Sequence, residues 1–390
     1  MQPLRIAFVT ARADAVGGAS VHVRDMARWL RAQGHEVHVI TGAAGPYLDL
    51  LREAEIPTVA LSALGRELHP LRDTRAAAQL HAALRRLRPD VLSLHSSKAG
   101  ALGRIVAPLL GLRPLYTPHG WAFTTGVPER EARRYRRIER LLARLPGVIV
   151  DVCDFERELA LAAGVGRPDD HVVIHNGMPE RPELPLADPG RSPPHVVMVA
   201  RFEAQKDHGT LLRALALVPD GLPWHLSLVG DGPLRSETAA LATALGLGDR
   251  IRFVGALTDV AATLADAQAF VLASRWEGFP RSVLEAMRAG LPVIATRVGG
   301  VHEAIQDGAQ GLLVAPGDAR ALAAALTQVL GRPDLRMMLG AAGRARYLDQ
   351  FTFERMADAT LATYQRVTHD APAAPDRSVG TVSGARARRR

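Results

Sequence analysis

The chain has little cysteine and no long apolar run. Its one cysteine, Cys153, excludes an internal disulfide and a structural zinc site made of cysteines. The longest segment without Asp, Glu, Lys or Arg covers residues 114–128, which is too short and too polar to span a bilayer. Residues 5–10 read as a strand and not as part of a secretory signal. We therefore expect a cytosolic protein.

The formal net charge of +8 is concentrated in two segments. Residues 128–145 contain seven arginines and three glutamates, and residues 371–390 contain five arginines and one aspartate. Each segment carries +4, so the remainder is nearly balanced. Nucleic-acid-binding proteins more often spread positive charge over a folded face with interleaved aromatic residues, which here make up only 5% of the chain. We expect no nucleic-acid partner.

Strands and helices alternate along most of the 390 residues, a length that favours two domains. This alternation is typical of parallel sheets. It is interrupted over residues 179–194, where prolines are frequent and no hydrophobic period remains. The predicted fold class is α/β, with two doubly wound Rossmann-like domains. The predicted parts are a domain at 1–178, a linker at 179–194, a domain at 195–350, a helix at 351–368 that crosses back to the first domain, and a disordered basic tail at 371–390.

Two basic residues directly follow the strand expected at 195–200, and ligands of open α/β sheets bind at the carboxyl ends of strands. Arg201 and Lys206 are close enough in the sequence to converge on one polyanion. A planar guanidinium and a compact ammonium together suit a diphosphate. Lys206 is also one of only two lysines, the other being Lys98. The alternative is a pair of solvated loop charges.

Glycines mark two further strand-to-helix turns. Gly17 and Gly18 precede the first long helix, where backbone N–H groups can approach an anion, although a tight turn alone would also need small residues. Gly230 and Gly232 resemble the opening of a dinucleotide fingerprint. Arg235 stands where its third glycine is expected, so a nicotinamide cofactor is the weaker interpretation.

Two carboxylates stand eight positions apart, Glu277 in a predicted loop and Glu285 in a predicted helix at 282–289. Glu285 has apolar neighbours, so its carboxylate needs polar partners, which ribose hydroxyls would supply. A hydrolase with paired carboxylates is a poorer interpretation, because no separate site for a general acid is evident. Cys153 has acidic neighbours that disfavour a thiolate, and we expect it to be structural.

The segment 274–296 resembles the E-x7-E signature of family 4 glycosyltransferases, which are retaining enzymes of the GT-B fold. Residues 199–208, 228–234, 253–255 and 298–303 look like successive blocks of the same family, and the resemblance covers nearly the whole chain except the tail. It implies a GT-B architecture, with two Rossmann-like domains facing across a cleft. It also implies a nucleotide-diphosphate sugar as donor substrate and no cofactor.

The resemblance also implies roles for individual residues. Arg201 and Lys206 would bind the donor diphosphate, Glu285 the nucleotide ribose and Glu277 the donor sugar. His119 matches a histidine that lies near the transferred sugar, and His119, Glu277, Arg201 and Lys206 form the expected catalytic set. The expected donor site also includes Gly17, Gly18, Gly230, Phe253, Gly278 and Phe279. Because Asp-x-Asp is absent and the side chains that could ligate a metal are not clustered in the sequence, we expect no metal.

The acceptor side is expected in the first domain. Ser97 and Lys98 open a predicted helix and could seat a phosphate there, together with His119 nearby. These residues resemble a subgroup that builds bacterial surface polysaccharide on polyprenyl-diphosphate carriers. The alternative for Lys98 is a solvated side chain beside a helix cap.

A basic amphipathic helix is expected between Arg130 and Arg144. Its arginines surround an apolar stripe, a pattern suited to an anionic membrane surface, although an ordinary surface helix would show it too. The stripe consists of Tyr135, Ile138, Leu141, Leu142 and Leu145.

The function expected from these features is retaining, metal-independent hexosyl transfer to a lipid-linked saccharide at the inner face of the cell membrane, with a UDP-sugar favoured over a GDP-sugar. A soluble acceptor and a nucleotide-sugar-binding protein without turnover are the alternatives. Slow hydrolysis of a donor would discriminate the last of these from an enzyme.

Overall fold

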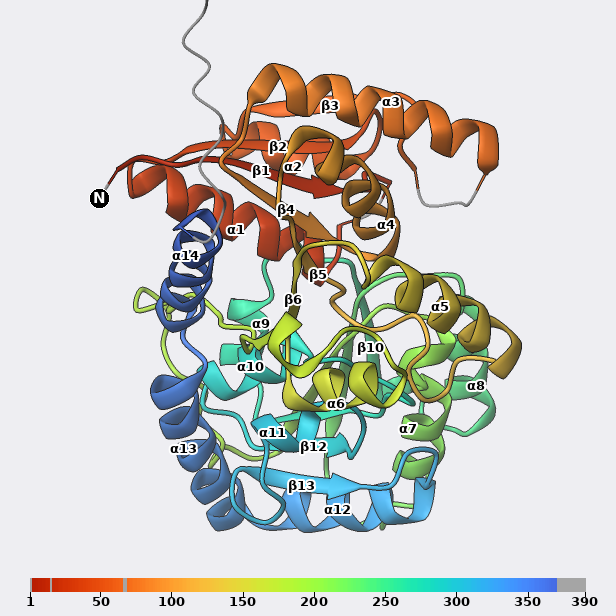
Figure 1. Ribbon diagram of the computed structural model, residues 1–390. Coiled ribbons are helices and arrows are strands. Elements are labelled where there is room, and N and C mark those ends of the chain that lie inside the picture. Colours follow the sequence, from red (N-terminus) through yellow and green to blue (C-terminus); the bar gives the residue numbers. More distant parts are fainter. Residues whose placement is uncertain (1, 15, 66–68, 370–390) are drawn as a thin grey trace, which may run out of the picture.

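The computed structural model describes residues 2–14, 16–65 and 69–369. The predicted tail at 371–390 lies outside the described residues. Two parallel sheets, each flanked by helices, form the two halves of the molecule (Figure 1). The predicted α/β class with two Rossmann-like domains in a GT-B arrangement is confirmed.

The first sheet has seven strands in the order β3-β2-β1-β4-β5-β6-β7. Every strand pair is parallel, so each connection returns across a face of the sheet. Its strands are β1 (Arg5–Thr10), β2 (Glu36–Gly42), β3 (Thr58–Leu61), β4 (Val91–His95), β5 (Leu115–Thr117), β6 (Val148–Asp151) and β7 (His171–Val173). The helices among them are α1 (Gly18–Ala32), α2 (Pro46–Glu53), α3 (Pro70–Leu87), α4 (Ser97–Val106), α5 (Glu129–Leu142) and α6 (Asp154–Ala162).

The second sheet has six parallel strands in the order β10-β9-β8-β11-β12-β13. Its strands are β8 (His195–Val199), β9 (His225–Val229), β10 (Ile251–Gly255), β11 (Ala269–Leu272), β12 (Val293–Thr296) and β13 (Gly311–Val314). The remaining helices are α7 (His208–Leu215), α8 (Arg235–Ala244), α9 (Ala261–Ala265), α10 (Arg281–Arg288), α11 (Val301–Ala304), α12 (Ala319–Gly331), α13 (Pro333–Gln350) and α14 (Phe353–His369).

Three strands were not expected from the sequence: β3, β7 and β13. All three lie at sheet edges and have only three or four residues. An edge strand is covered on fewer sides than a central one, so its sequence need not show a continuous apolar run. The pattern Thr58–Leu61, for example, alternates between exposed and partly buried residues before its last position.

The last helix, α14, leaves the second domain and packs on the first (Figure 1). Phe353, Met356, Leu361 and Tyr364 join a buried cluster that includes Phe8 of β1. The chain thus crosses between the domains twice, and the two crossings touch. Met178 and Thr352 form an isolated parallel bridge, with Met178 N–H donating to the Phe351 carbonyl at 3.0 Å.

Replacing Leu361 by Ala should destabilise the first domain, because this side chain is 8% exposed within the cluster. The expected loss is about 2–5 kcal/mol of unfolding free energy, from lost apolar burial and the cavity left behind. Urea unfolding followed by circular dichroism measures it. The exposed Ala362→Ser on the same helix serves as the control. Equal stability of Leu361→Ala and wild type would contradict the packing of α14.

Candidate active site

Each sheet has a point where the strand order reverses, between β1 and β4 in the first and between β8 and β11 in the second. Ligands of doubly wound sheets bind outside the carboxyl ends of the strands at such a point. Gly17 follows β1, His95 ends β4, Arg201 and Lys206 follow β8, and Glu277 follows β11. Four of the predicted site residues, Gly17, Arg201, Lys206 and Glu277, therefore lie at the two switch points, together with His95.

Lys206 and Glu277 are in direct contact, with Lys206 Nζ donating to Glu277 Oε1. The Ser274 hydroxyl donates to the same oxygen at 2.6 Å, and Glu277 is only 7% exposed. Backbone contacts hold the two loops together, since Arg275 N–H donates to the Gln205 carbonyl at 2.7 Å. The structure thus brings together one predicted cation and one predicted carboxylate, both held rigidly at the switch point.

Arg201 lies in the same loop but has a different partner, Glu203, at 2.7 Å. Its side chain is 39% exposed and is free to exchange this surface partner for an anion. Gly230 lies against Ala200, the residue before Arg201, because a Cβ at position 230 would stand 2.0 Å from the Ala200 carbonyl oxygen. With φ at +144°, the position requires glycine and lets the ends of β8 and β9 approach closely.

Glu285 is partly buried on α10 and makes no hydrogen bond with its side chain to any described residue. Burial raises the pKa of its carboxyl, while Arg281 and Arg288 act in the opposite direction. A carboxylate of this kind is available to polar groups of a ligand. Glu277 lies before α10 and Glu285 within it, as predicted.

The two predicted aromatic residues differ in their environment. Phe279 is 4% exposed, and its ring packs in the interior at 4.9 Å from His175, between centroids. The side chain is therefore enclosed by the protein, and the Phe279 carbonyl accepts from Asn176 Nδ2 at 2.9 Å. Phe253 is partly buried beside Phe202, with their ring centroids 5.9 Å apart.

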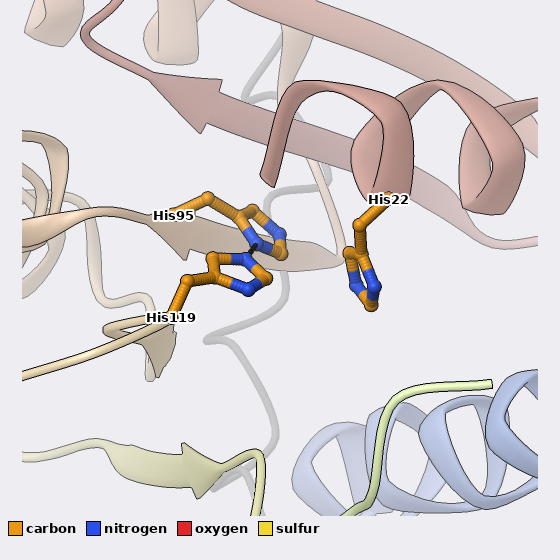
Figure 2. A group of neighbouring side chains, drawn as sticks. All are labelled: His22, His95 and His119. Carbon is orange, nitrogen blue, oxygen red and sulfur yellow. Dashed lines mark hydrogen bonds between the residues drawn. The ribbon is translucent and has the colours of Figure 1, made fainter. Parts of the chain in front are cut away.

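In the first domain, His119 lies beside two further histidines, His22 of α1 and His95 of β4 (Figure 2). His95 Nδ1 and His119 Nε2 are 2.8 Å apart and share a hydrogen bond. Burial lowers the pKa of all three, that of His119 to about 3 with a further contribution from Arg281. The three imidazoles are therefore neutral near pH 7. His119 itself has a φ of +56°, uncommon outside glycine.

Charged groups join the two halves of the site. Arg281 of α10 contacts Asp25 of α1 at 3.2 Å, with both side chains 10% exposed. The Cδ atom of Arg281 would lie 3.4 Å from a Cβ at Gly18. Gly17 is the N-cap of α1, so the start of this helix faces the second domain. Gly278 likewise faces the first domain, where a Cβ would stand 2.6 Å from Glu156 Oε1.

Comparison with known proteins agrees with this geometry. A family described as glycosyl transferases group 1 matches residues 188–346, and a glycosyl transferase 4-like domain matches residues 17–177. The chain belongs to the family 4 glycosyltransferases.

Similar proteins come from several bacteria. The chain is 30% identical to the lipopolysaccharide core biosynthesis glycosyltransferase LpsE of Rhizobium meliloti, over 71% of this chain and 76% of LpsE. It is 26% identical to the UDP-Gal:alpha-D-GlcNAc-diphosphoundecaprenol alpha-1,3-galactosyltransferase of Escherichia coli, over 78% of this chain and 82% of that protein. Among solved structures, Anabaena HepE in complex with UDP-glucose shares the fold, with a TM-score of 0.80, 22% identity, and 93% and 100% coverage.

Two of the residues predicted to contact the acceptor of this glycosyltransferase, Ser97 and Lys98, lie at the start of α4, and the third, His119, belongs to the histidine group. Lys98 is 8% exposed and forms a salt bridge with Asp73 of α3 at 2.6 Å. The Ser97 hydroxyl interacts with the hydroxyl of Tyr116. Because Lys98 already has a buried carboxylate partner, its role at an acceptor diphosphate stays a prediction and this geometry does not add to it.

Sequence reasoning missed several residues of the glycosyltransferase site: His22, His95, Asp25 and Arg281. His95 ends a predicted strand, so the strand-end rule could have included it. The histidines are 73 and 24 positions apart, and only the fold gathers them into a group able to ligate a metal; Asp154, His175 and Glu303 form a second. The expectation that no metal takes part stays a prediction. Cys153 is buried, and burial raises the pKa of its thiol, which disfavours a reactive thiolate.

Glu303 of α11 caps a helix of the other domain. Its carboxylate accepts from Asp154 N–H at 2.9 Å and Phe155 N–H at 2.8 Å, at the start of α6, and contacts His175 Nε2 at 2.7 Å. Burial raises the pKa of Glu303, but the hydrogen bonds from His175 and the two amides outweigh it, so the pKa is lowered overall. This carboxylate holds the two domains together beside the site.

Glu303→Gln should reduce the unfolding free energy at pH 7 by about 2 kcal/mol, the order of a hydrogen bond to a charged group. Because folding lowers this pKa, the wild-type advantage is complete above the ordinary glutamate pKa of about 4.3 and is lost as the pH falls through the lower pKa of the folded state. Urea unfolding of both proteins over a pH series from 7 down to about 3 measures the difference. The exposed Glu354→Gln is the control, and a difference independent of pH would contradict this role.

Proposed function

We propose that this glycosyltransferase moves a sugar from a nucleotide-diphosphate donor, with a UDP-sugar favoured, to a saccharide carried on a polyprenyl diphosphate. We propose further that transfer proceeds with retention of configuration, without a metal, and on the cytoplasmic side of the membrane. The observation that carries the proposal is the contact of Lys206 with Glu277 at the β8/β11 switch point.

The donor assignment is supported by what surrounds that contact. Lys206 and Arg201 follow the same strand, and Glu285 offers a carboxylate without a hydrogen-bond partner among the described residues. Together they suit the diphosphate and the ribose of a nucleotide. HepE, which shares the fold, is a complex with UDP-glucose, and the Escherichia coli relative is named for UDP-Gal; both favour uridine.

The chemistry follows from charge. Cleavage of the bond between the anomeric carbon and the diphosphate develops negative charge on the leaving group, which fixed cations stabilise more in the transition state than in the ground state. Lys206 is already held in position by Glu277, so little reorganisation is needed. Arg201 and Lys206 would supply the charge that a divalent ion supplies elsewhere, and the sequence has no Asp-x-Asp to hold one.

The acceptor assignment is supported by one relative, whose name specifies a diphosphoundecaprenol-linked sugar. A soluble acceptor is the alternative within the enzyme class. A nucleotide-sugar-binding protein without turnover is the alternative outside it. Such a protein would not need a leaving-group cation and a sugar-side carboxylate at one site. Lys206 and Glu277 form such a pair here.

Lys206→Ala should lower the rate of sugar transfer or of slow UDP-glucose hydrolysis roughly a hundredfold, because one charge-stabilising donor is lost. It should also weaken UDP binding in calorimetric titrations with EDTA present. NMR of the sugar released or transferred reports its anomeric configuration, expected to be α from an α-linked donor.

Arg213→Ala, an exposed charge on α7, is the control and should leave both measurements unchanged. UDP binding without hydrolysis or transfer in the wild type would favour the non-catalytic alternative. UDP binding that occurs only after a divalent ion is added would contradict the proposal that the protein works without a metal. Titration of GDP and NAD under the same conditions tests the nucleotide assignment.

The membrane proposal concerns α5. Much of its apolar stripe packs on the first domain: Leu142 is buried and Tyr135 contacts the core. Leu141, 61% exposed, is the large apolar side chain that faces outward. Among the described residues, no helix is both long and apolar enough to cross a bilayer. Attraction to a membrane would therefore come mainly from arginines.

Several of these arginines are available. Arg133, Arg134 and Arg137 are exposed on α5. A groove of about 720 Å³ lies beside the carboxyl end of the helix, and its charged lining consists of Arg113, Arg140, Arg144, Arg167 and Asp170. Arg104 also borders the groove but is buried and paired with Glu139 at 2.6 Å, so its charge is not available. This concentration of positive charge suits anionic lipid headgroups.

Changing Arg133, Arg134 and Arg137 together to Gln should release the protein from phosphatidylglycerol vesicles in a co-sedimentation assay. The reason is the loss of three exposed positive charges, and high salt should have the same effect. A triple change of Arg320, Arg355 and Arg366 to Gln, all exposed elsewhere, is the charge-matched control. Equal sedimentation of both variants would contradict a membrane surface at α5.

A further inference from the structure

A chain of buried hydrogen bonds leads from the last helix to His119. Tyr364 of α14 donates from its hydroxyl to Ser93 Oγ at 3.0 Å. Ser93 Oγ lies 3.0 Å from His95 Nε2, and His95 Nδ1 lies 2.8 Å from His119 Nε2 (Figure 2). Tyr364, Ser93 and His95 are each 2% exposed. Four side chains from α14, β4 and the loop that holds His119 are thus connected in a row.

The direction of the hydrogen bonds follows from the donors that must be satisfied. If Tyr364 donates to Ser93, the Ser93 hydroxyl donates to His95 Nε2, and His95 Nδ1–H then donates to His119 Nε2. Every buried donor in the row has an acceptor, as buried polar groups require. In the reverse direction no described residue accepts the Tyr364 hydrogen, which would then need a water molecule in the adjoining cavity. A phenol, with a pKa of about 10 in water, is also the better donor of the two hydroxyls.

The direction decides which nitrogen of His119 carries the proton. Burial and Arg281 keep its imidazole neutral, so the ring has one N–H and one bare nitrogen. With Nε2 accepting from His95, the proton is on Nδ1. No described residue forms a hydrogen bond with Nδ1, so this N–H is left for a ligand.

We propose that Tyr364, Ser93 and His95 are positioning residues that hold His119 in its Nδ1–H tautomer, so that His119 donates a hydrogen bond to a hydroxyl of the transferred sugar. The sugar as recipient rests on the proposed function; the tautomer rests on the hydrogen-bond chain alone. The consequence is a link between the substrate site and α14, the helix that crosses from the other domain.

The third histidine sits next to this chain. His22 Nδ1 is buried without a partner among the described residues, and a cavity of about 20 Å³ is bounded by His22, Ser93, His95 and Tyr364. This volume holds one water molecule, which would satisfy His22. A shared metal ion is the competing use of the histidines. Two nitrogens on one zinc ion lie roughly 3.3 Å apart, whereas His95 Nδ1 and His119 Nε2 stand at 2.8 Å, a hydrogen-bond distance.

The test is the tautomer of His119 in the full-length, ligand-free protein. Long-range proton–nitrogen NMR correlations of ¹⁵N-histidine distinguish Nδ1–H from Nε2–H, and the His119→Gln variant assigns the signals. Wild type should show His119 protonated on Nδ1. Tyr364→Phe and Ser93→Ala remove the first two donors, so both should give a mixture with Nε2–H.

Activity gives a second measurement. For UDP-glucose hydrolysis, Tyr364→Phe should lower kcat roughly five- to tenfold, the order of one hydrogen bond, and leave KM and UDP affinity unchanged. Thr363→Val is the matched control, because the neighbouring buried hydroxyl of Thr363 bonds, within the described part of the chain, to the Ala359 carbonyl of α14 alone. It should preserve both the tautomer and kcat.

A wild-type His119 protonated on Nε2 would overturn the proposal, as would an unchanged tautomer in both chain variants that bind UDP normally. Histidine signals that shift on removal of zinc by EDTA would also overturn it in favour of a metal site. A wild type that hydrolyses and transfers no sugar would count against the proposed function. The NMR result would still decide the tautomer in that case.

Discussion

The parallel direction of the strands in both sheets controls where chemistry can occur in this protein. In each domain all strands point the same way, so their carboxyl ends form one edge where the connecting loops meet. The strand order reverses once in each sheet. At that point the loops that follow the two neighbouring strands run in opposite directions and leave a crevice between them. The two edges face each other, which brings loops that are far apart in the sequence, such as those at Gly120 and Gly278, into contact.

Contact between the edges also determines the charge state of the site. Burial lowers the pKa of His119, and Arg281 of the second domain lowers it further. Arg281 is itself held by Asp25 of the first domain. The capping of α6 by Glu303 fixes the same interface from another side. The site is thus a property of two domains in contact and not of either alone.

The two lysines illustrate how far composition can be used. They are the only two lysines among 48 basic residues. Lys206 contacts Glu277 at a strand end, where a compact ammonium suits the site. Lys98 forms a buried salt bridge with Asp73, so its environment explains its retention without a ligand. The rarity of lysine indicated that both positions are unusual. The role of each lysine, however, depended on the residues that contact it from other elements.

The sequence by itself determined the fold class, most central strands and the residues that follow them, because buried strands and strand-end loops leave local patterns. It also placed Glu277 in a loop and Glu285 in a helix, since Gly278 and Pro280 exclude a continuous helix there. Only the tertiary structure decided the edge strands, the partner of Lys98, the histidine group and the path from Tyr364 to His119. Those features join residues up to 271 positions apart, and such contacts leave no periodic signal in the chain.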